Sequence, residues 1–426
     1  MKAAPLAVVL LAYALLGGLF AVLIPPWQNP DEPAHYNYVR QLAAGRLPVI
    51  EPTDWDATLV PIPPTRRDPP VERMTYEDHQ PPLFYLLSLP AYWLSGGSLT
   101  ALRLFALCVG GLSVVFAYRT AQAIFPEQHS LAAFTAAGVA LLPQHLFILS
   151  GYNNDALALA LIAAAVWQSV RLLSQERAPA APALLALAVT VGLGLWTKAT
   201  AYLTLPLAVY AALRAPAARA PDRLWRALLV GGAACLLAAP WWMRNLAHYG
   251  GFDFLGLQAH DAAVVGQPRT AEWIAQYGLD GVLTRLARTT FQSFWGQFGW
   301  MSVLFSERVY LALLGLTLLS ATLFAAWWAR ESRALSQFQH RSLELLGLLA
   351  LGTVLAFAWY NVQFVQHQGR YLYPALVSIA LAVGLGWHHA LGRLSGITPR
   401  LWLLATASLA GLNVYALWRV ILPAMT

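Results

Sequence analysis

Charged residues are scarce in this sequence of 426 residues: Asp, Glu, Lys and Arg together make up 11%. Soluble domains carry about 25%. Hydrophobic residues make up 58%, and the mean hydropathy is +0.53. This balance excludes an ordinary soluble domain of this size and is typical of a polytopic membrane protein.

Cysteine is almost absent, and so are several motifs that would indicate other functions. Cys108 and Cys235 both fall in apolar segments, which favours small buried side chains over a disulfide or a metal site. No nucleotide-binding glycine loop is present, which argues against a nucleotide donor held by a Rossmann domain. No basic run with interleaved aromatics accompanies the net charge of +7, so nucleic acid is not an expected partner. Lys and Arg in a membrane protein mostly set topology and contact lipid phosphates.

Long apolar segments recur along the whole chain, and a span needs about 20 such residues. We place spans near 5–24, 101–121, 130–149, 153–173, 181–197, 199–213, 225–243, 308–329, 343–361, 371–391 and 401–421. The first run is long and lacks a small-x-small site before Pro25, so we interpret it as an uncleaved span. The expected fold is an all-α integral membrane protein, a polytopic bundle of about 11 transmembrane helices.

The apolar stretch 82–96 is short and contains Pro82 and Pro90, so it predicts a helix at the membrane surface. With a cytoplasmic N-terminus, the short inside loops then hold most of the arginines, as the positive-inside rule requires. Two long segments, about 25–100 and about 244–307, lie outside. The division expected is a membrane module over 1–243 that includes loop 25–100, a second external loop over 244–307, and C-terminal helices over 308–426.

An acidic pair, Asp31 and Glu32, follows the first span directly. Transfer to a hydroxyl needs a base that takes the acceptor proton, and a partly buried carboxylate can serve. The alternative is structural: Asp31 caps a helix that begins at Pro33. His35 lies on the same expected helix. Both roles can hold for Asp31.

The segment around His79 and Gln80 brings two further carboxylates, Glu77 and Asp78, close to the membrane. Asp31, Glu32, Asp78 and His79 offer ligands for a divalent metal. Their spacing does not demand one, so no cofactor is assigned.

Three cations lie at expected external ends of spans: Lys198, Arg244 and Arg370, the last followed by Tyr371. A lysine can meet a lipid phosphate as a point charge, and a guanidinium binds phosphate oxygens in bidentate fashion. A leaving phosphate needs such charge stabilisation. Each cation alone is also an ordinary headgroup anchor. Asp155, at an external helix start, is either a cap or a functional carboxylate.

Short motifs at the ends of these spans resemble the GT-C-type membrane glycosyltransferases. These include the protein O-mannosyltransferase-like and aminoarabinose-transferase-like proteins and their bacterial polytopic relatives. The motifs are Asp-Glu-x-x-His-Tyr at 31–36, Gly45-x-x-Pro48, Gln80-Pro-Pro-Leu83, Asn154-Asp-Ala-Leu157, Leu195-Trp-Thr-Lys198, Trp242-x-Arg244-Asn245 and Gly369-Arg-Tyr-x-x-Pro374. Gln80 stands where the best-known members carry a lysine.

The resemblance implies a GT-C-like bundle with surface helices in the first external loop. It also implies inverting, single-displacement transfer from a polyprenyl-phosphate-linked sugar on the non-cytoplasmic face. Asp31 or Glu32 would be the base, and Lys198 and Arg370 would contact the lipid phosphate. The acceptor is a glycan, lipid or protein, and the expected location is the bacterial inner membrane, with the site on the periplasmic side.

Two alternatives remain at this point. A transporter or flippase of lipid-linked sugars would use the same basic span ends, but should show breaks or charges in mid-span. A polymerase or ligase using pyrophosphate-linked glycans would share the arginines and add Arg and His in the 244–307 loop, where Arg269, His248 and His260 occur.

Overall fold

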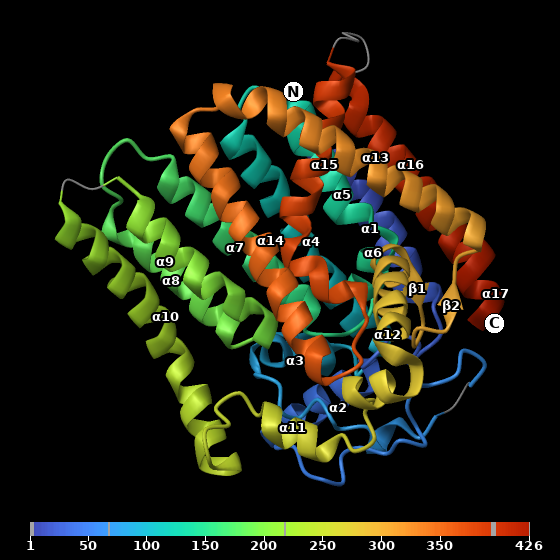
Figure 1. The fold of residues 1–426 in the computed structure, drawn as a ribbon. Helices are drawn as coiled ribbons and strands as arrows, with labels where there is room; N and C mark the ends of the chain where they lie inside the picture. Colours follow the sequence, from blue (N-terminus) through green and yellow to red (C-terminus); the bar gives the residue numbers. More distant parts are fainter. Residues whose placement is uncertain (1–3, 67–68, 217–218, 393–397, 426) are drawn as a thin grey trace.

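The computed structural model describes residues 4–66, 69–216, 219–392 and 398–425, and the protein is built from helices (Figure 1). The strands described are a two-stranded antiparallel pair, β1 (Gln297–Phe298) and β2 (Val303–Leu304). Eight helical segments of the described residues are long and apolar enough to cross a membrane, or nine if one bent pair is a single span. They are α1 (Ala4–Leu23), α4 (Leu99–Ile124), α7 (Asp155–Leu173), α10 (Ala220–Tyr249), α13 (Glu307–Glu331), α14 (Gln337–Gln363), η4 (Gly369–Ala375) with α15 (Leu376–Leu391), and α16 (Leu401–Tyr415) with its continuation, and the bent pair is α5 (His129–Leu141) with α6 (Pro143–Leu149). The chain is therefore a multi-pass membrane protein.

The expected number of eleven spans is not reached by this length test. Two expected spans correspond to shorter helices, α8 (Ala181–Leu195) and α9 (Thr204–Arg214), the latter preceded by the 3-10 turn η2 (Ala199–Leu203). Eight or nine spans are thus established by length and composition, and the eleven remain a prediction.

Helix α4 forms the middle of the bundle, where it packs against α1, α5 and α7 (Figure 1). Helices α8, α9 and α10 form a side layer with a small-residue core of its own, which includes Ala188, Ala208 and Ala234. Such small side chains let membrane helices approach closely. On the other side, α13 packs against α15 and α16 against α5. The C-terminal helix continues through a π-helical stretch, η6 (Ala416–Ile421), into α17 (Leu422–Met425).

The two long connections expected outside the membrane contain helices at one end of the bundle (Figure 1). The first connection has α2 (Glu32–Ala43), η1 (Val71–Arg73) and α3 (Leu83–Leu94), so helices occur there as expected. The second has the short α11 (Leu257–Ala263) and α12 (Thr270–Trp295), which is kinked at Gly278, where φ is 73°. Neither helix was expected from the sequence. Two further turns, η3 (Ser332–Ala334) and η5 (Thr398–Arg400), follow α13 and precede α16.

The bend of 62° between α5 and α6 follows from Pro143, which has no N–H to continue the helix. A break inside a membrane leaves carbonyl groups that need partners. His145 Nδ1 lies 2.7 Å from the carbonyl oxygen of Val139, and Asn413 Nδ2 donates to the carbonyl of Leu141 at 2.8 Å. The carbonyl groups of Val139 and Leu141, at the break between α5 and α6, therefore have partners within the protein.

Gly369 sets the distance between η4 and α12. A Cβ at this position would collide with backbone atoms of Phe294 and with the carbonyl oxygen of Thr290. Its N–H donates to Ser293 Oγ at 2.7 Å. The absence of a side chain thus lets the start of η4, including Arg370, lie directly on α12.

We expect Gly369→Ala to destabilise the protein by about 1–3 kcal/mol, the usual cost of overpacking, because a backbone contact cannot rotate away. Thermal unfolding of the detergent-solubilised protein measures the effect. Gly347→Ala in α14 is the control, since a Cβ there meets nothing within 4 Å. Equal melting temperatures for the two variants would contradict the assigned role of Gly369.

Candidate functional site

Asp31 lies between α1 and α2, and its carboxylate points to residues distant in sequence. Oδ2 accepts from Arg370 at 2.7 Å, and Oδ1 accepts from the Tyr76 hydroxyl at 3.0 Å. The backbone is left-handed, with φ 66°, a conformation that Asp tolerates better than most residues. Asp31 occupies the N-cap position of α2, as the capping alternative expected, but its side chain makes no capping hydrogen bond.

Neighbouring side chains stabilise the ionised form of Asp31. Burial alone would raise the pKa of this carboxyl, but the Arg370 guanidinium and, less strongly, His35 outweigh burial, and the pKa lies below its usual value. The side chain of Asp31 is 21% exposed and that of Arg370 is 13% exposed. The site therefore holds an ionised carboxylate that is still accessible from outside.

The side chain of Glu32 points in a different direction from that of Asp31. It is fully buried and forms a bidentate pair with Arg103 of α4, at 2.7 Å for both contacts. The same carboxylate accepts from the backbone N–H groups of Trp27 at 3.0 Å and Tyr152 at 3.1 Å. Its oxygens are thus occupied by four donors and face away from solvent.

Arg103 uses its remaining donors on the end of α1. The guanidinium donates to the carbonyl oxygens of Ala21, Ile24 and Pro25 at 3.1, 2.7 and 3.1 Å. Carbonyls at a helix C-terminus have no partner within the helix. Arg103 therefore ties α1, α2 and α4 together beside Asp31.

Lys198 and Asp155 form a second ion pair, with Nζ 2.7 Å from Oδ1 and each side chain 17% exposed. Asp155 is the first residue of α7, and Lys198 precedes η2. Both are at the end of the bundle that carries the first connection.

His35 connects the two pairs electrostatically. Burial lowers the pKa of its imidazole, against the influence of Glu77. The charges of Lys198, Asp31 and Asp155 also act on this pKa. Both ion pairs therefore lie within the electrostatic reach of one histidine.

Gln80 links the first connection to α7. Its Oε1 accepts from Asn154 at 3.1 Å, and its Nε2 donates to Glu77 at 2.8 Å. The neighbouring His79 is buried, and its ring lies 4.3 Å from that of His260 in α11. Gln80 is thus at the edge of the site, whereas His79 is covered by the second connection.

Arg244 makes its described contacts elsewhere. It donates to Asn245 and Tyr249 and to the carbonyl of Pro48, and its guanidinium lies over the Trp241 ring at 4.7 Å. Among the described residues these contacts join neither ion pair. The structure therefore brings Lys198 and Arg370 together in one region and anchors Arg244 behind the first connection.

Tyr371 follows Arg370 and supports it. The Arg370 guanidinium lies 5.5 Å from the Tyr371 ring centroid, and that ring meets Tyr360 edge-on at 5.9 Å. Arg370 Nε is buried without a hydrogen-bond partner among the described residues. The guanidinium thus keeps a free donor in addition to its bond to Asp31.

Asp78 lies apart from the two ion pairs and is 3% exposed. Burial raises its pKa to about 8, partly opposed by a bond of 2.7 Å from Gln41. A carboxyl that is protonated at neutral pH is a poor metal ligand. No group of three or more His, Cys, Asp or Glu suited to a metal occurs in the described part of the chain.

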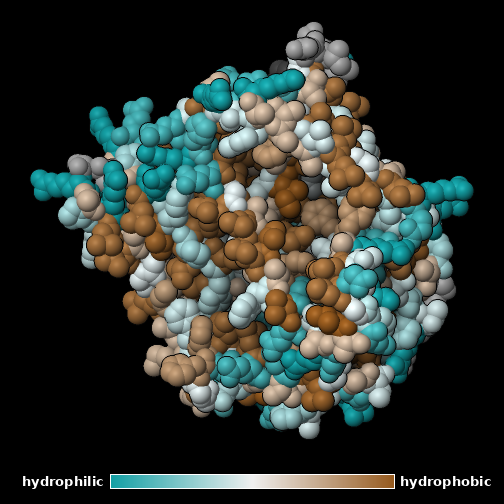
Figure 2. Space-filling view, in the orientation of Figure 1, coloured by the Kyte–Doolittle hydropathy of each residue, from teal (hydrophilic) through white to brown (hydrophobic). Residues whose placement is uncertain are grey.

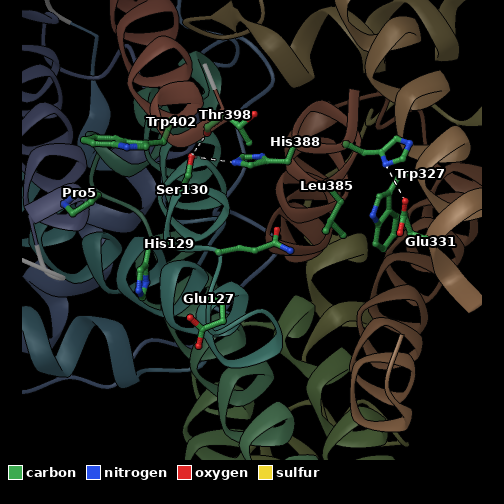
Figure 3. Close-up of a pocket in the computed structure, with 12 residues that line it drawn as sticks. Pro5, Glu127, His129, Ser130, Trp327, Glu331, Leu385, His388, Thr398 and Trp402 are labelled. Carbon is green, nitrogen blue, oxygen red and sulfur yellow. Dashed lines mark hydrogen bonds and ion pairs between the residues drawn. The ribbon is translucent and has the colours of Figure 1, made fainter. Parts of the chain in front are cut away.

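A cavity of about 600 Å³ opens at the other end of the bundle (Figure 3). Its lining includes Trp327, Trp402 and the His389–Glu331 pair at 3.4 Å, and His388 Nε2 lies 3.1 Å from Ser130. None of the residues expected to form the site lines this cavity.

Sequence reasoning missed three polar residues that organise the site. Arg103 stands inside an apolar run, and an arginine in such a run was a readable signal. Tyr76, which bonds Asp31, and Tyr85, whose hydroxyl lies 2.7 Å from His35 Nδ1, gave no comparable signal. Their roles depend on contacts across the first connection.

Taken together, the site has two partly exposed carboxylates, Asp31 and Asp155, and each is paired with a cation, Arg370 or Lys198. A carboxylate can take a proton, and the cations can receive an anion. This combination suits a reaction in which a hydroxyl is deprotonated while an anionic group departs.

Comparisons with known proteins agree with this architecture. The family described as "Predicted membrane protein (DUF2142)" matches residues 94–379. No curated protein matches the sequence. ArnT from Cupriavidus metallidurans, crystallised with undecaprenyl phosphate, superposes with a TM-score of 0.55 and 14% identity, over 98% of this chain and 73% of that one.

The oligosaccharyltransferase of Archaeoglobus fulgidus, solved with a tethered acceptor peptide, superposes with a TM-score of 0.51 and 14% identity. That alignment covers 99% of this chain and 54% of the archaeal one, so the chain spans about half of that enzyme. These two likenesses show that the fold is GT-C-like.

Replacing Arg103 tests the tie between α1, α2 and α4. We expect Arg103→Met to destabilise the protein by about 3–5 kcal/mol, because it leaves the buried Glu32 carboxylate unpaired. Thermal unfolding in detergent measures the loss. Arg40→Met on α2, where no ion pair is described, is the control, and an equal effect of the two changes would refute the special role of Arg103.

The raised pKa of Asp78 should make the stability of the protein depend on pH. With a folded pKa of about 8, the folded protein keeps a proton that the unfolded chain has released, so stability falls as pH rises from about 4 to about 8. The slope is about 1.4 kcal/mol per pH unit at most. Asp78→Asn should remove this part of the dependence, and melting curves at pH 6 and pH 8.5 measure it. A variant that loses as much stability as wild type over that range would show that Asp78 is ionised throughout.

Proposed function

Since the chain belongs to the "Predicted membrane protein (DUF2142)" family and has a GT-C-like fold, we propose that it is a membrane glycosyltransferase. It moves a sugar from a polyprenyl-phosphate donor to an acceptor hydroxyl. The observation that carries this proposal is the pairing of Asp31 with Arg370 next to the Lys198–Asp155 pair, at the end of the bundle that holds α2 and α3. The undecaprenyl phosphate bound in the ArnT crystal structure supports a polyprenyl-phosphate ligand here.

In the proposed reaction Asp31 is the base. It takes the acceptor proton while the acceptor oxygen attacks the anomeric carbon, and the bond from that carbon to the phosphate oxygen breaks with inversion. The negative charge that develops on the phosphate is stabilised by Arg370 and Lys198. Glu32, with its oxygens occupied by Arg103 and two backbone N–H groups, serves to position Asp31.

The two ion pairs provide a way to couple donor binding to base activation. Arg370 holds the pKa of Asp31 low when no substrate is bound. A lipid phosphate that attracts Arg370 would weaken this effect, and the pKa of Asp31 would rise towards the range where a base works best. Lys198 would exchange Asp155 for phosphate in the same way.

The orientation in the membrane is part of the proposal. A cytoplasmic N-terminus places Arg171, Arg214 and Arg341 inside and the Asp31 site outside, as the positive-inside rule favours. With α8 and α9 counted as short spans, the bundle crosses the membrane eleven times. In a bacterial cell this is the inner membrane, with the site facing the periplasm and with a glycan, lipid or protein acceptor.

The transporter alternative has less support. It requires mid-span breaks that expose polar groups to a substrate. The described break between α5 and α6 has bonds at Val139 and Leu141 that keep its carbonyls within the protein. At these two positions the break does not expose polar backbone groups to a substrate.

We expect Asp31→Asn to lower sugar transfer by about 10²–10⁴-fold, the usual range for loss of a general base. A deletion strain carrying this variant should accumulate a monophosphate-linked sugar and lose one envelope glycan, as measured by mass spectrometry. Glu32→Gln leaves one acceptor oxygen for two of the four donors and turns an amide NH2 towards the other two, so it should lower the amount of protein in the membrane. Scaled to that amount, it should keep more activity than Asp31→Asn because Asp31 is still present.

Asp56→Asn is the matched control and should behave as wild type, because Asp56 lies in the same connection but its described partners are Thr58 and the exposed Arg73. If Asp31→Asn restores the wild-type profile, the base assignment fails and the transporter alternative gains.

Undecaprenyl phosphate added to the purified protein should raise its melting temperature, because a ligand that binds only the folded state stabilises it. Lys198→Gln and Arg370→Gln should reduce this shift, whereas Arg244→Gln should keep it, since the described contacts of Arg244 join neither ion pair. If only Arg244→Gln reduced the rise in melting temperature, the phosphate would bind near Arg244 and not near Lys198 and Arg370.

A further inference from the structure

The end of α10 and the turn after it expose apolar side chains, which we call the apolar tip: Met243, Leu246, Phe252 and Phe254. Their exposed fractions are 68, 38, 90 and 40%. A phenylalanine exposed to this degree is unfavourable in water. A set of such side chains in sequence marks a contact surface rather than an isolated exposure.

The turn that presents Phe252 is held in place. Gly250 and Gly251 take positive φ values of 72° and 57°, which glycine adopts without strain. Asn245 donates to the carbonyl of Phe254 at 3.0 Å, and Asp253 accepts from the backbone of Ala259 at 2.8 Å. Phe252 is therefore displayed by a bonded turn and not by a frayed end.

The apolar tip continues the surface with which α10 faces the bilayer. Leu236, seven residues before Met243 and so on the same side of the helix, is 76% exposed within a membrane span. Apolar side chains follow α10 towards its lower end in Figure 2. A 30-residue helix is about 45 Å long, against a hydrocarbon core of about 30 Å, so the end of α10 reaches the headgroup level.

Side chains around the tip have the composition of a membrane interface. Trp241 and Trp242 lie in the last third of α10, and the Trp242 ring meets Phe254 edge-on at 5.8 Å. Aromatic side chains gather at this depth because they have an apolar body and tolerate the polar boundary. We propose that the apolar tip inserts into the lipid surface, at the boundary of headgroups and acyl chains on the side that carries Asp31.

Insertion of the apolar tip would also fix the position of α11 relative to the membrane. The tip leads directly into α11, where Gly256 approaches His79 and the His260 ring lies 4.3 Å from the His79 ring. Insertion of Phe252 would therefore attach to the membrane the segment that covers His79. This docking surface does not depend on the proposed sugar transfer.

Fluorescence from a single label tests the insertion. In the full-length protein with Cys108→Ala and Cys235→Ala, Phe252→Cys is labelled with the polarity-sensitive dye NBD and placed in phosphatidylglycerol–phosphatidylcholine nanodiscs. We expect a blue-shifted emission and several-fold stronger quenching by lipids carrying a nitroxide at acyl carbon 5 than for the control label at Thr53→Cys. Thr53 is exposed in the first connection.

Equal quenching at the two positions would overturn the proposal. A blue shift at position 252 without lipid quenching would also overturn it and would mean that a protein surface, such as a second copy of this chain, covers the tip. In that case the shift should depend on the number of protein copies per nanodisc.

Discussion

The buried pair of Glu32 and Arg103 is the constraint on which the site depends. Arg103 donates to the carboxylate and to three carbonyls at the end of α1, while Glu32 also accepts from Trp27 and Tyr152. An ion pair out of water is favourable only when nearly every donor and acceptor is satisfied, and here the geometry meets that condition. The pair holds the start of α2 in one position and leaves Asp31, the adjacent residue, with its carboxylate turned towards Arg370.

Two acidic neighbours thus have different environments. Glu32 is fully buried and each of its oxygens accepts hydrogen bonds, whereas Asp31 is partly exposed and pairs with Arg370 of η4. A difference of environment between adjacent carboxylates is how proteins assign a structural role to one and a chemical role to the other. The approach of η4 to α12 at Gly369 completes this arrangement because it brings Arg370 to the same end of the bundle.

The same end of the molecule combines a charged site with apolar surroundings. Lys198, Asp155, Asp31 and Arg370 form neutral pairs, so the site is balanced until an anion enters. Around it, the second connection packs α11 over His79 and exposes the apolar tip. If both proposals hold, a lipid-borne anion would find two cations for its phosphate and, beside them, a protein surface inserted at the level of the headgroups.

Composition and span periodicity were enough to predict a polytopic helical membrane protein, because a bilayer accepts few other structures. Polar residues next to apolar runs stand out in sequence, which is why Asp31, Lys198, Arg244 and Arg370 could be chosen as candidates. Which of them meet was decided by the tertiary structure alone. The Asp31–Arg370 contact joins residues 339 positions apart, and Glu32 found Arg103 rather than the nearby Arg40. Arg244 looked equivalent to the other two cations in the sequence, but it donates to Tyr249 and to the carbonyl of Pro48 in the first connection. Packing, and not position along the chain, determines which charge reaches which partner.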